Sequence, residues 1–183
     1  MKYFNKIDAS DIYLSPVCMD DAEKYIEWLS NPDISDKVHN TCKVFNIESE
    51  KEFLLDTLKG GNYTFSIVRK SDNTLIGNCG LKNINHIDKT ATVGIFIGDS
   101  DNQNKGYGTL ALKALVNYGF SVLNLNNINL SVFDFNERAI KCYKKVGFKE
   151  YGRRHQAYYV NNEYHDVIYM EILKDSFYNN MNG

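Results

Sequence analysis

Residues 103–109 read Gln-Asn-Lys-Gly-Tyr-Gly-Thr, and this stretch decides the fold. An apolar run at 93–97 comes before it and predicts a strand, and the amphipathic pattern after it predicts a helix. Two spaced glycines let the backbone turn tightly and approach a ligand closely. The free N–H groups of the first helical turn then favour an anion. The strand, loop and helix together predict a site for a phosphate-bearing cofactor.

Two familiar phosphate loops do not fit this stretch. The Walker pattern needs a Lys-Ser or Lys-Thr pair near its second glycine, but here Gly108 is followed by Thr109 and Leu110. The dinucleotide pattern needs a third glycine and a later acidic residue, and neither is present. What remains, Gln-x-x-Gly-x-Gly before a small residue, resembles the acetyl-coenzyme A pyrophosphate loop of the GCN5-related N-acetyltransferase (GNAT) family. From these residues alone, an ordinary glycine turn is an equal alternative.

A second segment, residues 136–148, resembles the other signature of the same family, Asn-x-x-Ala-x-x-x-Tyr-x-x-x-Gly-Phe. The runs at 118–125 and 164–170 resemble the branch that contains spermidine and ribosomal-protein N-terminal acetyltransferases. The resemblance extends over residues 75–173. It implies an N-acetyltransferase that uses acetyl-coenzyme A and a primary amine, either a polyamine or a protein N-terminus. The alternatives are a coenzyme A-binding sensor without catalysis and an antibiotic acetyltransferase of the aminoglycoside type.

Composition restricts the class of protein further. The chain has 183 residues, which predicts a single domain over 1–183, and its formal net charge of −2 gives no general attraction to nucleic acid or membranes. No apolar run approaches the roughly 18–20 residues of a membrane helix, and the N-terminus lacks the apolar core of a signal peptide. Four scattered cysteines favour reduced thiols over a disulfide frame or a metal site. We therefore expect a cytoplasmic protein without metal. A homo-oligomer is compatible with these features.

The periodicity of the chain predicts an α/β fold in which a mixed, mostly antiparallel sheet is flanked by about four helices. Helices are expected over 20–30, 47–59, 107–123 and 137–146, with Pro32 after the first and Gly60-Gly61 after the second. Strands are expected over 63–69, 74–84, 90–97, 128–133, 157–160 and 165–173. In the helix over 47–59, the side chains expected to face inward are Phe53, Leu54, Thr57 and Leu58.

Acetyl transfer needs a positioned donor, a neutral amine and a leaving thiolate that is stabilised or protonated. The resemblance implies that the pantetheine arm pairs with the strand ending at Phe96 and Ile97, and that Asn136 contacts the arm. Capping of the following helix is a second reading of Asn136, and both readings are compatible. The expected donor-binding residues are Phe96, Ile97, Gln103, Asn104, Lys105, Gly106, Tyr107, Gly108, Thr109 and Asn136.

Tyr143 is the candidate general acid. A phenol with a pKa near 10 is protonated at neutral pH and can donate to the departing sulfur. Tyr143 lies two helical turns after Asn136, so both can face one groove; a tyrosine that only packs in the core is the alternative. Cys142 is a rival as a nucleophile, but adjacent helix positions point in different directions. We therefore expect the Cys142 thiol to lie outside the groove of Tyr143.

The general base is absent from its usual place. Many relatives carry an acid in Ala-Glu-x-Gly on the central strand, whereas this chain has Thr92 there. The proton is then expected to leave through water, through another residue that the sequence does not identify, or directly to solvent. The four histidines have no metal-ligand spacing; they are His39, His86, His155 and His165.

An acidic run near the first two helices is a candidate for attracting a polyamine or a basic peptide. Its members are Asp33, Asp36, Glu48, Glu50 and Glu52. A solvated charged face is the alternative interpretation of the same residues.

Overall fold

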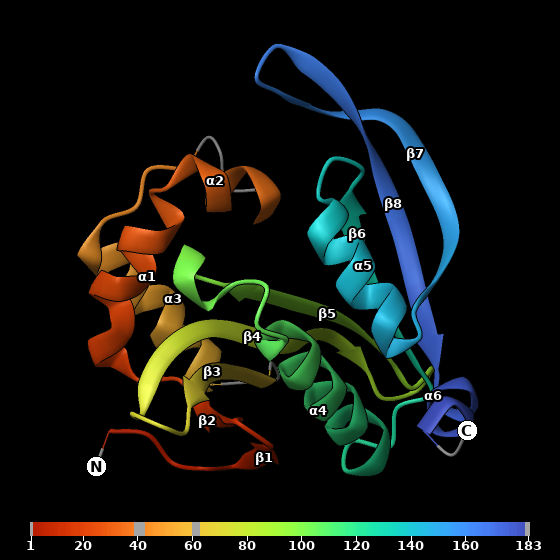
Figure 1. Ribbon diagram of the computed structural model, residues 1–183, viewed down its shortest axis with the longest axis horizontal. Helices are drawn as coiled ribbons and strands as arrows, with labels where there is room; N and C mark the ends of the chain where they lie inside the picture. Colours follow the sequence, from red (N-terminus) through yellow and green to blue (C-terminus); the bar gives the residue numbers. More distant parts are fainter. Residues whose placement is uncertain (1, 39–42, 60–62, 182–183) are drawn as a thin grey trace.

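The computed structural model describes residues 2–38, 43–59 and 63–181 (Figure 1). The expectations for His39, Cys42, Gly60 and Gly61 therefore lie outside the described residues. One eight-stranded sheet runs in the order β1-β2-β3-β4-β5-β6-β8-β7. Every neighbouring pair is antiparallel except β5 and β6, which are parallel. The strands are β1 Ile7–Ala9, β2 Ile12–Pro16, β3 Tyr63–Arg69, β4 Thr74–Asn85, β5 Thr90–Ile97, β6 Asn127–Phe133, β7 Lys149–Val160 and β8 Glu163–Leu173.

Helices cover both faces of this sheet. They are α1 Ala22–Leu29, α2 Pro32–Ser35, α3 Ile47–Lys59, α4 Tyr107–Ser121, α5 Glu137–Val146 and α6 Lys174–Met181. Buried side chains of α1 and α3, such as Tyr25 and Leu54, pack with Tyr13 and Val68 in one core. Buried side chains of α4 and α5 pack with the other face of the sheet in a larger core. The expected mixed, mostly antiparallel sheet flanked by helices is confirmed.

The local sequence explains where the helix α5 begins and ends. The Asn136 side chain accepts a hydrogen bond from the Ala139 N–H at 3.3 Å and so caps the first turn. Gly147 ends the helix with φ at +111°, a left-handed conformation that favours glycine. The Phe148 ring then folds back and meets the Tyr143 ring edge-on, with centroids 6.0 Å apart. Both ends of α5 are therefore determined by local sequence.

The structure differs from the sequence expectations at several points. Phe53 and Leu58 are 58% and 49% exposed, and Glu50 is buried instead, at 5%. The inward line of α3 is therefore Glu50, Leu54 and Thr57, the i, i+4, i+7 positions that meet α1 and β3. Pro32 follows α1 as expected but also opens α2, where its missing N–H costs nothing.

The β7–β8 hairpin is longer than expected and projects beyond the rest of the sheet (Figure 1). Its turn, Asn161 and Asn162, has φ values of +52° and +63°, as a two-residue hairpin turn requires. Across residues 2–38, 43–59 and 63–181, no helix has both the length and the apolar character that a bilayer span requires.

Candidate functional site

The site begins where the two central strands separate. β5 and β6 pair at only three positions, Thr90–Asn127, Ala91–Ile128 and Thr92–Asn129, although both strands are described in full and continue beyond them. A cavity of about 620 Å³ opens between the diverging strands. Ile95, Phe96 and Ile97 of β5 line one side of it, and Ser131 and Val132 of β6 line the other. Backbone groups at the end of β5 are thus available to an extended ligand.

The predicted anion-binding loop closes one end of this cavity. Gly106 is the N-cap of α4 with φ at +84°, which turns the chain into the helix. The first-turn N–H groups of α4 have no partner within the helix and carry the positive end of its dipole. The expected loop residues that line the cavity are Gln103, Asn104, Gly106, Tyr107, Gly108 and Thr109. Lys105 lines an adjoining cavity of about 800 Å³ instead.

The two glycines of the loop have different physical roles. A Cβ at Gly106 would meet nothing within 4 Å, so only its backbone angle requires glycine. A Cβ at Gly108 would lie 3.8 Å from Ile97 Cγ1 and 3.9 Å from Cys142 Sγ, which is ordinary contact. A methyl group at Gly108 would therefore fit, whereas a larger side chain would extend into the space between β5 and α5.

Asn136 and Tyr143 enter the same cavity from α5. Tyr143 is 8% exposed, and burial raises the pKa of its hydroxyl above the ordinary value. The hydroxyl is therefore protonated throughout the physiological pH range and can act as a proton donor.

The expectation that Cys142 lies apart from Tyr143 is wrong. Both side chains line the cavity, which extends along α5 and reaches the first turn of α4. The Cys142 thiol lies 3.4 Å from Thr109 Oγ1, and burial raises its pKa. A thiol with a raised pKa is a poor nucleophile at neutral pH, so Cys142 acts as a packing and hydrogen-bonding group.

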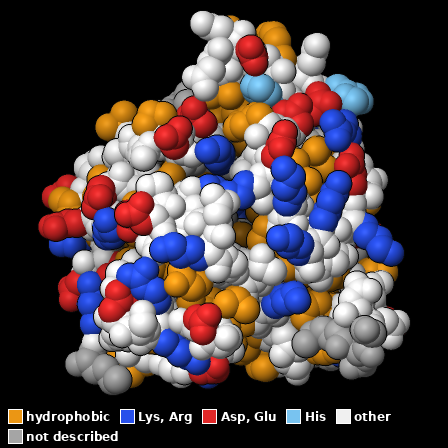
Figure 2. Space-filling model, viewed as in Figure 1, with side chains coloured by type: hydrophobic (Ala, Val, Ile, Leu, Met, Phe, Trp, Pro, Cys, Tyr) orange, Lys and Arg blue, Asp and Glu red, His pale blue; other side chains and the backbone are white. Residues whose placement is uncertain are grey.

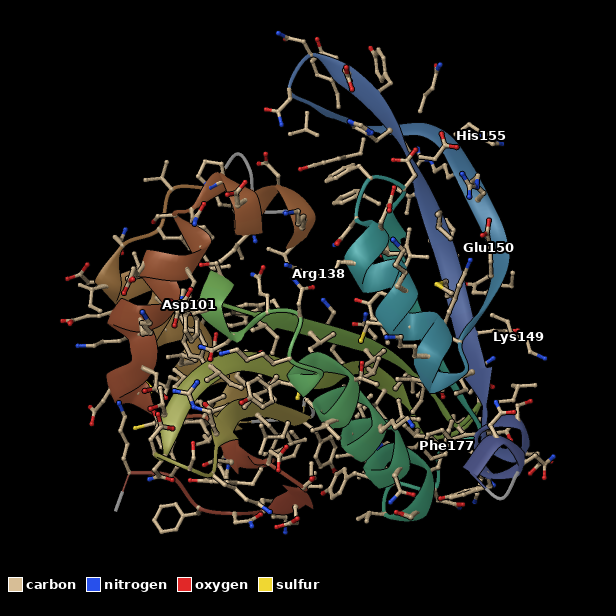
Figure 3. All side chains as sticks on the ribbon, viewed as in Figure 1. Asp101, Arg138, Lys149, Glu150, His155 and Phe177 are labelled. Atoms are coloured by element: carbon tan, nitrogen blue, oxygen red, sulfur yellow. The ribbon has the colours of Figure 1, made fainter. Side chains whose placement is uncertain are left out.

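A basic rim that the sequence analysis missed surrounds the cavity (Figure 2). Its members are Lys37, Arg138, Lys141 and Lys145. The last three occupy i, i+3 and i+7 of α5, a helical stripe that the sequence could have revealed. Arg138 points from α5 toward the loop, where its guanidinium donates to the Gln103 side chain (Figure 3). The Gln103 amide in turn donates to the Ile97 carbonyl at 3.3 Å.

Thr92 lies at the point where the strands separate. Its hydroxyl donates to Asn129 Oδ1 at 3.1 Å, which fixes the last paired step of the sheet. The carboxylates among the described residues that line the cavity are Asp33 and Glu137. Neither lies on β5.

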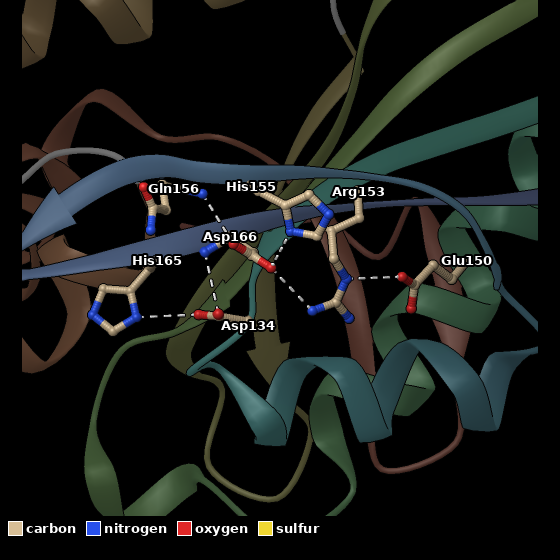
Figure 4. Close-up of polar contacts among 7 residues, drawn as sticks. All are labelled: Asp134, Glu150, Arg153, His155, Gln156, His165 and Asp166. Atoms are coloured by element: carbon tan, nitrogen blue, oxygen red, sulfur yellow. Dashed lines mark hydrogen bonds and ion pairs between the residues drawn. The ribbon is translucent and has the colours of Figure 1, made fainter.

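Two histidines belong to a polar network at the base of the β7–β8 hairpin (Figure 4). His165 Nδ1 lies 3.2 Å from Asp134 Oδ1, and His155 Nδ1 lies 2.9 Å from Asp166 Oδ2. Asp166 Oδ1 also accepts from the backbone N–H of Gln156, whose φ is +49°. This network holds the bulge of β7. In the described part of the chain, no group of three or more His, Cys, Asp or Glu side chains is arranged to hold a metal.

The acidic residues considered for the acceptor do not form one surface. Asp33 lines both cavities, and Asp36 accepts from Asn161 Nδ2 of the hairpin at 3.4 Å. Glu48 and Glu52 are exposed on α3, and Glu50 is buried. Of these five residues, Asp33 lines the site and Asp36 contacts the hairpin.

Comparison with known proteins identifies the family to which this chain belongs. The family model described as Acetyltransferase (GNAT) domain matches residues 14–169, most of the chain. The protein therefore belongs to the GNAT acetyltransferase family.

Several curated relatives are similar in sequence. Spermidine N(1)-acetyltransferases of Vibrio cholerae serotype O1 and Escherichia coli K12 are 33% and 36% identical over 113 and 110 residues. These matches cover 62% and 60% of this chain, and the chain spans 65% and 59% of the relatives. An uncharacterized N-acetyltransferase, p20 of Bacillus licheniformis, is 26% identical over 163 residues, 87% of this chain and 90% of that protein.

Solved structures support the same fold. The crystal structure of spermidine N-acetyltransferase from Vibrio cholerae in complex with CoA and spermine has a TM-score of 0.84 at 24% identity. The match covers 92% of this chain and 99% of that one. At 24% identity, this similarity shows only that the two proteins share a fold.

Proposed function

We propose that the protein is an acetyl-coenzyme A-dependent N-acetyltransferase that joins donor and amine in a ternary complex. The observation that carries this proposal is the single cavity that connects the first turn of α4 to Tyr143 between the diverging strands. The donor carries a pyrophosphate at one end and a thioester at the other. It therefore needs an anion-binding helix turn and a proton donor that open into the same cavity.

The residues of this chain fit such a donor. The N–H groups of Tyr107, Gly108 and Thr109 would hold the pyrophosphate, and Arg138, Lys141 and Lys145 would add positive charge beside it. The edge of β5 that ends at Ile97 would pair with the amide groups of the pantetheine arm. Fixing both reactants in this way can lower a barrier by roughly 7–11 kcal/mol at best.

Tyr143 is the side chain proposed to act on the leaving group. As the amine nitrogen bonds to the acetyl carbon and the carbon–sulfur bond breaks, the Tyr143 hydroxyl gives its proton to the sulfur. The proton on the new amide nitrogen returns to the phenolate through water. Thr92 cannot hold that proton, so solvent replaces the acid that many relatives have on this strand.

The proposed acceptor is a small polyamine. Two curated relatives are spermidine acetyltransferases, and a similar structure was solved with CoA and spermine. In this chain, Asp33 lines the cavity and Asp36 accepts a hydrogen bond from Asn161 of the hairpin. These two carboxylates are the groups proposed to bind a second ammonium group. A peptide N-terminus remains the alternative acceptor within the same class.

Release of free thiol from acetyl-coenzyme A tests this proposal. The assay compares spermidine, spermine, an aminoglycoside and peptides with free N-termini, with N-acetylated peptide as the matched control. The highest kcat/KM is expected for a polyamine. Turnover confined to peptides or aminoglycosides would reassign the acceptor. Tight binding of acetyl-coenzyme A without turnover on any amine would instead identify a sensor, the alternative that the threonine at position 92 favours.

A further inference from the structure

Arg69, the last residue of β3, connects the β3–β4 turn to the segment that carries the anion-binding loop. Its Nε and Nη2 atoms donate to the two carboxylate oxygens of Asp72 at 3.0 and 2.6 Å. Its Nη1 atom donates to Asn102 Oδ1 at 2.6 Å, and the Tyr107 side chain also interacts with the guanidinium. One side chain thus contacts residues on both sides of the loop at 103–106.

The pair with Asp72 fixes the direction in which Arg69 points. Two parallel hydrogen bonds to one carboxylate hold the plane of a guanidinium. Asp72 is itself anchored, since Oδ1 also accepts from the Thr74 N–H at 3.3 Å. The remaining donor, Nη1, is therefore aimed at Asn102 before any ligand arrives.

Asn102 connects the Arg69 guanidinium to the start of the loop. It is 6% exposed, and it immediately precedes Gln103. Its N–H donates to the Asp99 carbonyl at 3.0 Å, and the Gln103 N–H donates to the Ser100 carbonyl at 2.9 Å. A buried amide oxygen that loses its donor is costly, so the Asn102 side chain would move, and the start of the loop with it.

Arg69 lines the adjoining cavity with Lys105 and does not line the cavity proposed for the donor. Asn102 and Gln103 line both cavities and so connect Arg69 to the donor site. We propose that Arg69 is a positioning residue that acts through Asn102 to hold the anion-binding loop ready for coenzyme A. This inference rests on the donor-binding function proposed above.

Calorimetry with coenzyme A and steady-state kinetics test the role. The variants are Arg69→Gln, Arg69→Lys, Asn102→Ala and the double variant Arg69→Gln/Asn102→Ala. Arg154→Gln, which removes an exposed arginine of β7, is the matched control. Arg69→Gln should weaken coenzyme A binding and raise the KM for acetyl-coenzyme A by about tenfold, as expected for one charged hydrogen bond. The kcat should change by less than about twofold, because the reacting atoms are untouched.

The remaining variants separate positioning from a general structural effect. Arg69→Lys keeps a donor for Asn102 and should recover part of the affinity. The double variant should bind no more weakly than the worse single variant, because both changes remove the same contact. Additive losses, a kcat that falls as much as KM rises, or unchanged affinity in Arg69→Gln would overturn the role. A parent protein that does not bind coenzyme A would overturn the proposed function and this inference together.

Discussion

At the scale of single residues, Tyr143 lines the cavity and carries its proton at neutral pH, as an ordinary phenol does. Burial raises its pKa, which keeps the proton on the oxygen and also makes the phenol a weaker acid. Its neighbour Phe148 fixes the ring by an edge-on contact that does not involve the hydroxyl. The ring and the oxygen can therefore be tested separately.

Replacing Tyr143 with Phe should lower kcat by about 10²-fold, within the usual range for general acid–base catalysis. The ring contact with Phe148 persists, so the affinity for coenzyme A should change little. Thiol release and calorimetry measure the two quantities. A Phe variant that turns over at the parent rate would show that Tyr143 only packs in the core.

Glu50 gives a prediction about pH. Burial raises the pKa of its carboxyl, with Lys43 acting in the opposite direction. Because the folded pKa exceeds the unfolded value of about 4.3, the folded state binds the proton more tightly. The contribution of this group to stability is therefore complete below about pH 4.3 and is lost as the pH rises through the folded pKa.

Glu50→Gln should consequently raise the melting temperature at neutral pH and leave it unchanged at about pH 4, below the unfolded pKa. Thermal unfolding at both pH values is the measurement. The exposed Glu52→Gln on the same helix is the control and should have no effect at either pH. An equal gain at both pH values would exclude the carboxyl charge as the cause.

At the scale of elements, the turn from β5 into α4 is the part whose backbone the chemistry depends on. Gly106 is needed for its left-handed φ, whereas Gly108 faces the space near Ile97 and Cys142, where a methyl group fits but a branched side chain would extend further. Different substitutions at the two glycines therefore separate strain from obstruction.

Gly106→Ala should weaken coenzyme A binding, because a non-glycine residue at φ +84° is strained by about 1–3 kcal/mol. Gly108→Ala should be nearly neutral, since its methyl group meets only ordinary contacts. Gly108→Val should weaken binding by about tenfold or more, through lost hydrogen bonds to the anion. Calorimetry on folded variants gives the three affinities. Unchanged affinity in Gly108→Val would show that this segment is an ordinary turn.

At the scale of the whole molecule, one core joins the two halves of the divided sheet. Ile76 of β4 and Ile172 of β8 belong to the same buried group, which α4 bridges across the opening. Phe177 of α6 completes that group (Figure 3), with its ring centroid 5.6 Å from that of Phe120. Packing remote from the cavity therefore supports both halves of the sheet.

Phe177→Ala should reduce the free energy of unfolding by about 3–5 kcal/mol, as is usual for a fully buried phenylalanine. Denaturant unfolding measures the loss. Phe4→Ala, at a phenylalanine that is 61% exposed, should stay within about 0.5 kcal/mol of the parent. A loss at Phe177 as small as that at Phe4 would mean that α6 does not support the core.

Local sequence determined the elements around the site. The bounds of α3, α5, β3 and β5 match the expected ranges. Caps, left-handed glycines and hydrophobic periodicity act over a few residues, so they can be read without the fold. The strands β1 and β2 were missed because three and five residues carry too little periodicity, and α6 was missed because its sequence is largely polar.

Only the tertiary structure decided which side chains meet. Lys37 reaches the rim of the cavity, Cys142 shares the cavity with Tyr143, and Arg69 contacts Asn102 across 33 positions of sequence. Glu50 is buried while Phe53 is exposed, because the orientation of α3 against α1 selects the inward face. Such contacts depend on how separate elements pack against one another. Because their partners are far apart in the sequence, no local sequence pattern predicts them.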